Sequence, residues 1–428
     1  MPCSTGRGSF PPTDMQTDLA DFIKDTPEGR EADRILRTCV HCGFCTATCP
    51  TYQLLGDELD GPRGRIYLMK QVLEGAEVTA KTQLHLDRCL TCRNCETTCP
   101  SGVQYGRLVD IGRQVVEDRV ERPLRERVVR MALKEGLTSP LFGPALKLGQ
   151  LLRPLLPKVL RNKVPTAQRA VGGWPARTHA RKVVLLEGCV QPAMTPNINP
   201  ATARVLDALG IETVRARRAG CCGAIRHHLN DHAGAFADIK RNIDAWWPHV
   251  SGDQAGGAEA IVMNASGCGA MVKEYGHLLR DDPAYADKAA RISAMTKDLA
   301  ELLPAAGDTL RAAQTEATRQ RVVFHPPCTL QHGQKVRGAV EALLATLGAE
   351  VLPFGESHLC CGSAGTYSVL KPEFAYPLRD RKLAHLLTPR PDVILSANVG
   401  CITHLQSGTE LPVQHWIEWV DQRLHPRP

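Results

Sequence analysis

The sequence predicts an α+β multidomain protein, in which an α-helical N-terminal domain precedes a duplicated α/β domain. Three observations predict this class. Two cysteine-rich runs near the N-terminus are joined by a segment with helical periodicity. A different cysteine pattern then occurs twice, with a period of 139 residues. In both copies, short apolar β-branched runs alternate with helical segments, which is typical of a parallel sheet.

Composition narrows the class of protein further. The chain has 428 residues, of which 43% are hydrophobic and 23% charged, and this excludes a disordered or fibrous protein. A net charge of +7 is too small to predict binding to nucleic acid. No stretch approaches the roughly 20 apolar residues that span a bilayer. Residues 1–30 lack the apolar core of a secretory signal, so we expect a cytoplasmic protein.

Eight of the 17 cysteines lie in two runs that both read C-x2-C-x2-C-x3-C-P. This is the ligand spacing of bacterial two-cluster ferredoxins, in which the fourth cysteine of each run binds the other cluster. The sequence therefore predicts two [4Fe-4S] clusters with crossed ligand sets. The first set is Cys39, Cys42, Cys45 and Cys99, and the second is Cys89, Cys92, Cys95 and Cys49.

Structural zinc is the alternative reading of these runs. Zinc takes four tetrahedral ligands, usually as two separated pairs, and four thiols within a few residues of one another suit it poorly. Without an export signal the compartment is expected to be reducing, where dense cysteine indicates metal more often than disulfides.

Segments whose sequence pattern predicts helices surround the two cysteine runs. Residues 61–75 begin with a proline in the first turn and end at a glycine, and residues 84–88 lead into the second run. Such an insert indicates a helical ferredoxin-type domain. Residues 105–120 and 124–134 continue the helical pattern, with Gly136 expected to end the last helix.

Four polar residues near the runs are expected to be surface or packing residues rather than metal ligands. Arg63 and Arg65 are expected on a solvated helix face, with an effect on a cluster's potential as the alternative. His41 and His85 are expected at the surface or in packing, because eight thiols already fill two clusters.

A proline- and glycine-rich stretch separates the two halves of the chain. Residues 153–182 contain eight basic residues and no acidic one, and predict a linker that either docks on an acidic partner or anionic membrane or is merely solvated. The expected segments are a disordered tail (1–20), the helical ferredoxin-type domain (21–152), the basic linker (153–182), and two α/β repeats (183–305 and 320–428).

The remaining cysteines, apart from Cys3 in the tail, form the repeat. Each copy has a single cysteine, a Cys-Cys-Gly triplet 32 residues later, and a final cysteine. These residues are Cys189, Cys221, Cys222 and Cys268 in the first copy, and Cys328, Cys360, Cys361 and Cys401 in the second. Predicted strands at 183–186, 261–263, 322–324 and 393–395 precede the thiols, so each set is expected at the carboxyl edge of a parallel sheet.

The duplication favours a functional role for these thiols over an incidental pair or a strained disulfide. Gly223 and Gly362 allow a tight turn, so that the two neighbouring sulfurs face one site. We therefore expect one or two further iron–sulfur centres in the repeats. A thiol/disulfide redox site is the less favoured use, and Cys3 is expected to be an unstructured free thiol.

Motifs of several enzyme classes are missing. The sequence contains no glycine-rich fingerprint for nicotinamide, flavin or ATP and no recognisable nucleophile context, so no catalytic residue is expected. His227, His228 and His358 flank the Cys-Cys-Gly triplets and are expected at the surface. With only one-electron carriers predicted, the chain is expected to relay electrons between partners.

The segments from Thr26 to Gly75 and from Leu84 to Arg113 closely resemble the iron–sulfur subunits of bacterial glycolate oxidase (glycolate dehydrogenase). The Cys-Cys-Gly duplication is similar to the wider family with lactate-utilisation, anaerobic glycerol-3-phosphate dehydrogenase and heterodisulfide reductase subunits. The resemblance implies flavoprotein (FAD-binding) partners that oxidise glycolate to glyoxylate, and electron transfer to a membrane quinone or another respiratory acceptor at the inner face of the cell membrane. It also implies that the family's usual start is Met15.

One departure separates the chain from the heterodisulfide reductases. Their repeats end in C-x-x-C, whereas Ala265 and Asn398 replace the first cysteine of that pair here. Four thiols per repeat remain, and disulfide-reducing chemistry is put in doubt. The rival functions are an iron–sulfur subunit of a lactate or glycerol-3-phosphate dehydrogenase complex, an autonomous reductase of a disulfide or quinone, and a zinc-stapled scaffold.

Overall fold

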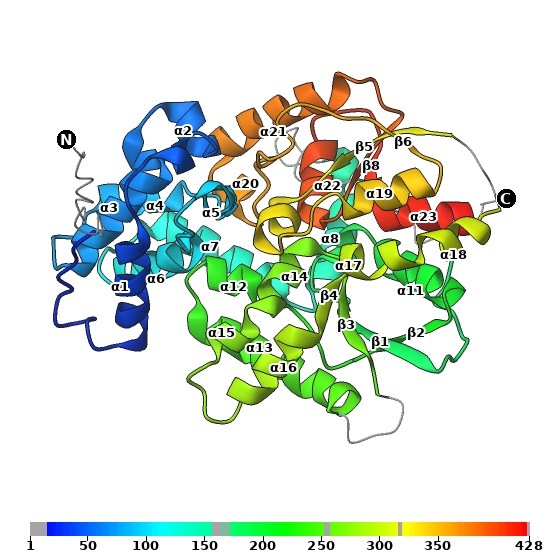
Figure 1. Ribbon diagram of the computed structural model, residues 1–428, viewed down its shortest axis with the longest axis horizontal. Coiled ribbons are helices and arrows are strands. Elements are labelled where there is room, and N and C mark those ends of the chain that lie inside the picture. Colours follow the sequence, from blue (N-terminus) through cyan, green and yellow to red (C-terminus); the bar gives the residue numbers. More distant parts are fainter. Residues whose placement is uncertain are drawn as a thin grey trace, which may run out of the picture. The chain divides into compact units, whose positions relative to one another are not determined.

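The computed structural model describes residues 15–155, 166, 168, 172–251, 257–315 and 319–425. The expectations for Cys3, for most of the tail and for much of the linker lie outside the described residues. The chain divides into two compact units, residues 1–121 and 122–428 (Figure 1). No helix among the described residues combines the length and apolarity needed to cross a bilayer.

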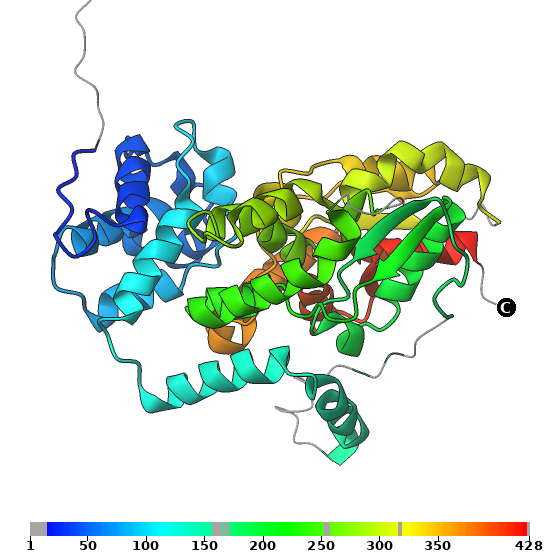
Figure 2. The ribbon, with the colours of Figure 1, turned by 90° about the horizontal axis from the view of Figure 1, so that it is seen from below.

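The described part of the first unit is helical throughout (Figure 2). Its α-helices are α1 (Pro27–Thr38), α2 (Pro50–Leu55), α3 (Pro62–Leu73), α4 (Ala80–Asp87), α5 (Asn94–Thr98) and α6 (Tyr105–Glu117), with 3-10 turns at Phe44–Thr46 and Glu58–Asp60. A proline opens α1, α2 and α3, where its missing N–H has no intrahelical partner to lose. Apolar faces of α1, α3 and α6 form the core, so the helices expected around both cysteine runs are confirmed.

Residues 15–20 are ordered, in contrast to the expected disordered tail. The Ala20 N–H donates to the Leu73 carbonyl at 2.9 Å, and Met15 and Leu19 pack against the helical core. Burial of the apolar side chains of Met15 and Leu19 stabilises this segment. The polar composition of the residues before Met15 gave no sign of this contact.

The second unit begins with two helices, α7 (Leu124–Thr138) and α8 (Phe142–Leu151). The expected stop at Gly136 is wrong, because one glycine inside a helix costs only about 1 kcal/mol. The helix ends before Pro140, where Ser139 takes the extended conformation that a following proline imposes. The first unit ends at Glu121, earlier than the boundary expected at residue 152. The helix α7 belongs to the second unit, where its residue Glu135 pairs with Arg226 at 2.6 Å.

Two four-stranded parallel sheets form the rest of this unit, and their topologies are identical. The strands are β1 (Arg181–Leu185), β2 (Ile211–Arg215), β3 (Ala260–Met263), β4 (Thr296–Asp298), β5 (Arg321–His325), β6 (Glu350–Val351), β7 (Val393–Ser396) and β8 (Val413–His415). Their orders are β2-β1-β3-β4 and β6-β5-β7-β8. The mixed α+β class with a duplicated parallel α/β region is confirmed.

Helices cover both sheets. They are α10 (Gln191–Met194), α11 (Ile198–Ala208), α12 (Ala224–His228), α13 (His232–Val250), α14 (Ser266–Lys273), α15 (Tyr275–Leu278), α16 (Ala286–Met295), α17 (Leu299–Leu302), α18 (Gly307–Ala312), α19 (Ala339–Thr346), α20 (Tyr367–Leu370), α21 (Pro372–Leu387), α22 (Val399–Gln406) and α23 (Trp416–Leu424). Residues of both repeats share one apolar core, and the partly buried ion pair between Arg204 of α11 and Asp421 of α23 (2.6 Å) joins the repeats.

Candidate metal centres

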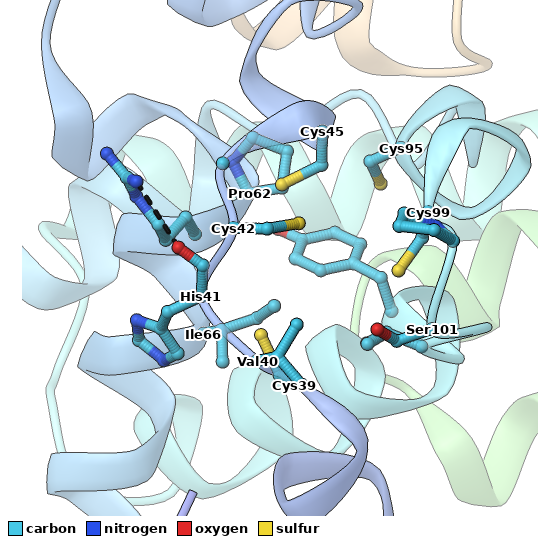
Figure 3. A pocket seen from close by; sticks show the side chains of 15 residues that line it. Cys39, Val40, His41, Cys42, Cys45, Pro62, Ile66, Cys95, Cys99 and Ser101 are labelled. Carbon is cyan, nitrogen blue, oxygen red and sulfur yellow. Dashed lines mark hydrogen bonds between the residues drawn. The ribbon is translucent and has the colours of Figure 1, made fainter. Parts of the chain in front are cut away.

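One pocket in the first unit is lined by thiols from both cysteine runs. Cys39, Cys42 and Cys45 enter it from the first run and Cys99 from the end of the second, and their sulfur atoms face a common space (Figure 3). The empty space is about 430 Å³ and opens to solvent. Cys95 also lines the pocket, but Cys49 does not. The structure thus brings together the four thiols of the first predicted set.

The other four thiols form a second group. Burial raises the pKa of Cys95 most, and the neighbouring thiols of Cys92, Cys89 and Cys49 raise it further. In the first pocket, burial and the thiols of Cys39, Cys99 and Cys42 likewise raise the pKa of Cys45 to about 11. Crowded buried thiols resist ionisation in this way unless a nearby cation compensates their charge, which is what a bound metal supplies.

The two runs share an unusual backbone conformation. His41 and Gly43 have φ angles of 53° and 83°, and Thr91 and Arg93, at the same positions of the second run, have 51° and 56°. A left-handed residue other than glycine costs about 1 kcal/mol or more, and such strain persists where the surroundings require it. Alternating left-handed turns point successive N–H groups into one concavity, which suits an anionic cluster. The backbone and the donor chemistry of both runs therefore fit an iron–sulfur group.

Hydrogen bonds also reach the sulfur atoms of the second group. The Thr91 N–H and the Tyr105 hydroxyl donate to the Cys89 sulfur at 3.4 and 3.7 Å, and the Thr51 hydroxyl lies 3.3 Å from the Cys49 sulfur. Hydrogen bonds to sulfur ligands are among the factors that set the potential of a cluster.

A buried residue beside this second group, Asp60, accepts from the Thr51 hydroxyl through its carbonyl and pairs with three basic side chains through its carboxylate. It lies 2.7 Å from Arg88, 3.4 Å from Arg65 and 3.1 Å from the His85 ring. Arg65 also donates to the Thr51 hydroxyl at 3.2 Å, two contacts away from the Cys49 sulfur. The expectation of a solvated Arg65 is wrong: its side chain is 1% exposed, and the Asp60 carboxylate, the Thr51 hydroxyl and the His85 carbonyl accept hydrogen bonds from its guanidinium.

Arg63, His85 and His41 agree better with the roles expected from the sequence. Arg63 is about 38% exposed and pairs with Glu58. His85 is a packing residue through its contact with Asp60. His41 lines the first pocket, and Arg63 donates to its carbonyl at 3.4 Å (Figure 3).

In the first repeat, the four thiols converge beyond the carboxyl ends of β1, β2 and β3. The sulfur atoms of Cys189 and Cys221 are 3.6 Å apart. Hydrogen bonds from Cys189 and Cys222 lower the pKa of Cys221 to about 3, while hydrogen bonds with Cys221 and Cys268 raise that of Cys222. The thiols thus contact one another in a chain, as a shared metal centre requires.

In the second repeat, the same four positions again come together. The pKa of Cys361 is raised overall: its hydrogen bond with Cys360 lowers the pKa, but its hydrogen bond with Cys401 and its burial raise it. Contact with Cys360 raises the pKa of Cys328. A β-carbon at Gly362 would lie 2.4 Å from the Ala375 carbonyl, and the φ angle there is 87°, so the triplet needs its glycine.

The two residues that replace the closing cysteines differ in their contacts. Ala265 is a buried residue directly before α14. Asn398 donates to the Cys401 sulfur at 3.7 Å and accepts from the Gly267 N–H, next to Cys268, at 3.3 Å. Asn398 therefore links the thiol sets of the two repeats.

Two buried residues beside the second thiol set were missed by sequence reasoning. Lys382 of α21 lies close enough to Cys328, Cys360 and Cys361 for their charges to raise its pKa, although burial lowers it more. His325 ends β5, where the first repeat has Leu186. A position-by-position comparison of the two repeats could have found His325, because it is a histidine where the first repeat has an apolar residue. The flanking histidines differ: His228 and His358 are exposed as expected, whereas His227 is buried.

Comparison with known proteins agrees with both parts of this arrangement. A family model described as a 4Fe-4S dicluster domain matches residues 35–103, and one described as a cysteine-rich domain matches residues 183–273 and 322–406. The glycolate oxidase iron-sulfur subunit of Escherichia coli (strain K12) is 54% identical over 96% of this chain and 99% of its own length. The chain belongs to the family of glycolate oxidase iron–sulfur subunits. The predicted family and the binding of iron–sulfur groups are thereby confirmed.

More distant relatives follow the same pattern. The probable glycolate oxidase iron-sulfur subunit of Bacillus subtilis (strain 168) is 31% identical over 88% of this chain and 89% of its own length. Lactate utilization protein A of Geobacillus thermodenitrificans (strain NG80-2) is 27% identical over 56% of this chain and 99% of its own length. The number of clusters and the ligand assignments stay predictions.

Proposed function

We propose that this member of the glycolate oxidase iron–sulfur subunit family is the electron-transfer subunit of a glycolate oxidase complex. Flavoprotein (FAD-binding) subunits oxidise glycolate to glyoxylate, and this chain passes the electrons to a membrane quinone or another respiratory acceptor. The observation that carries the proposal is the 54% identity to such a subunit over 96% of the chain. The gathering of sixteen cysteines into four thiol groups supports it.

Two [4Fe-4S] clusters in the first unit supply one-electron transfer when bound. Cys39, Cys42, Cys45 and Cys99 hold the first cluster, and Cys89, Cys92, Cys95 and Cys49 hold the second. Cys42 is exposed, Cys45 and Cys99 are partly exposed and Cys39 is buried, so the first set reaches the protein surface at Cys42. Electrons exchange with a partner most readily at that exposed thiol, and the second set, in which Cys49, Cys89 and Cys95 are buried, is the more shielded of the two.

The isolated chain is expected not to oxidise glycolate with an artificial acceptor, because the carbon chemistry belongs to the flavoprotein subunits. Adding those subunits should restore glycolate-dependent reduction of the acceptor. Turnover by the isolated chain with an artificial donor and a disulfide or quinone would instead support an autonomous reductase. Both assays use the full chain, purified without oxygen.

We propose a peripheral position at the inner face of the cell membrane. Leu148 and Leu151 are exposed on α8, Leu141 directly before it and Leu155 after it, near Lys147 and Arg153 in the sequence. Exposed leucines beside basic residues suit the surface of an anionic bilayer. The chain should therefore sediment with vesicles that contain anionic lipid and stay in solution with neutral vesicles, and Leu151→Ser should weaken the binding. Equal recovery with both vesicle types would contradict this position.

A further inference from the structure

His325 is a buried histidine of the second repeat, beside its thiol set. It is fully buried at the end of β5, and neither of its ring nitrogens has a hydrogen-bond partner among the residues that the structure describes. An unsatisfied buried polar atom costs about 1–3 kcal/mol. Two such atoms in one well-packed residue point to a ligand that the ring binds.

The surroundings of the ring indicate what that ligand is. One ring nitrogen of His325 and the sulfur atoms of Cys361 and Cys401 all lie within 4.8 Å of one another. Two ligand atoms that each lie ~2.0–2.3 Å from a shared metal ion are separated by no more than about twice that distance. Three ligand atoms within 4.8 Å of one another are therefore close enough to serve one metal centre. Neutral imidazole and thiolate are both common ligands of iron and zinc.

The first repeat has no counterpart of this ring. Leu186 stands at the equivalent position, 139 residues earlier, and is buried in the apolar core. The first repeat therefore offers four thiols alone, whereas the second offers four thiols and an imidazole. The two repeats share a topology but differ in their metal-binding chemistry.

We propose that a ring nitrogen of His325 binds an iron of the iron–sulfur centre in the second repeat, beside Cys361 and Cys401. The inference rests on the repeats carrying iron–sulfur centres, which goes beyond the two clusters of the first unit. The imidazole gives the second repeat a neutral ligand that the first repeat lacks, and a cluster bound by imidazole has a higher potential than the same cluster with thiolate in its place.

Pulsed paramagnetic resonance of the full chain tests the proposal. The protein is prepared without oxygen, with ¹⁵N-histidine or with ordinary histidine, and reduced in steps. The expected result is a histidine nitrogen coupling that disappears in His325→Leu, the variant that copies the first repeat. It should persist in His404→Gln, a matched control, because His404 is a buried histidine of the same repeat that contacts the Ala375 carbonyl at 3.1 Å.

A second variant guards against loss of folding or iron in His325→Leu. His325→Cys supplies a thiolate in place of the imidazole, and should keep the iron, lose the nitrogen coupling and lower the potential of that centre. A coupling that survives in His325→Cys, or is absent from the native protein, would overturn the proposal. So would zinc in the second repeat, or an iron content of only about eight per chain, which two [4Fe-4S] clusters account for. That last outcome would leave electron transfer by the first unit intact.

Discussion

Cys42→Ser and Cys92→Ser should each abolish electron flow from glycolate to the physiological acceptor. Each substitution replaces a soft thiolate by a hydroxyl that stays protonated, so one iron loses its ligand and the cluster becomes labile. Cys42 lines the first pocket, and Cys92 belongs to the second group, so the two variants address different predicted clusters. The measurement is acceptor reduction by the complex reconstituted with the proposed flavoprotein subunits.

The flavin supplies an internal control. In both variants, glycolate should still bleach the flavin of the partner subunits, because oxidation of glycolate precedes the relay. Cys3→Ser is the matched control, since Cys3 belongs to neither cysteine pattern. A variant at Cys42 or Cys92 that kept full activity with the physiological acceptor would contradict the relay role of that cluster.

Asp60→Ala should lower the free energy of unfolding of the first unit by about 3–5 kcal/mol, the cost of breaking a buried ion pair from one side. The substitution leaves the guanidinium of Arg65, which is 1% exposed, without the carboxylate that compensates its charge. It also removes the partner of Arg88 and His85. The measurement is the shift of the urea unfolding midpoint, monitored by helical circular dichroism under anaerobic conditions.

Glu58→Ala gives the matched control for this variant. Glu58 lies in the same short turn and pairs with Arg63 at 2.7 Å, but both side chains are more than one-third exposed. Exposed ion pairs are worth about 0–1 kcal/mol, so Glu58→Ala should change stability little. If the two variants unfolded at the same urea concentration, the buried carboxylate would not hold this unit together in the way the contacts suggest.

The sequence predicted those features that local spacing determines. The identical steps of the two cysteine runs indicated two thiol groups, and the crossed placement of Cys99 away from its own run agrees with the lining of the first pocket. The 139-residue period predicted two similar α/β halves, and both sheets have the same strand order. In each case the signal occurs twice within the chain, which distinguishes it from a chance pattern.

Features that depend on distant contacts were not predicted. Nothing in the spacing shows that Asp60, Arg65 and His85 meet in one buried cluster, because they come from three different elements. The strands β4 and β8 are three residues long and carry polar residues, so no alternation marks them. Helix α7 continues through Gly136 because the local penalty of a glycine is smaller than the gain from continuing the helix.

Iron and acid-labile sulfide counts on anaerobically purified chain test the central claim most directly. The account predicts a brown protein with at least about eight iron and eight sulfide per chain, enough for two cubes, and paramagnetic signals after reduction with dithionite. Higher counts would place further centres in the repeats. A colourless protein that contains zinc and stays silent after dithionite would contradict the claim that these thiols hold electron-carrying clusters.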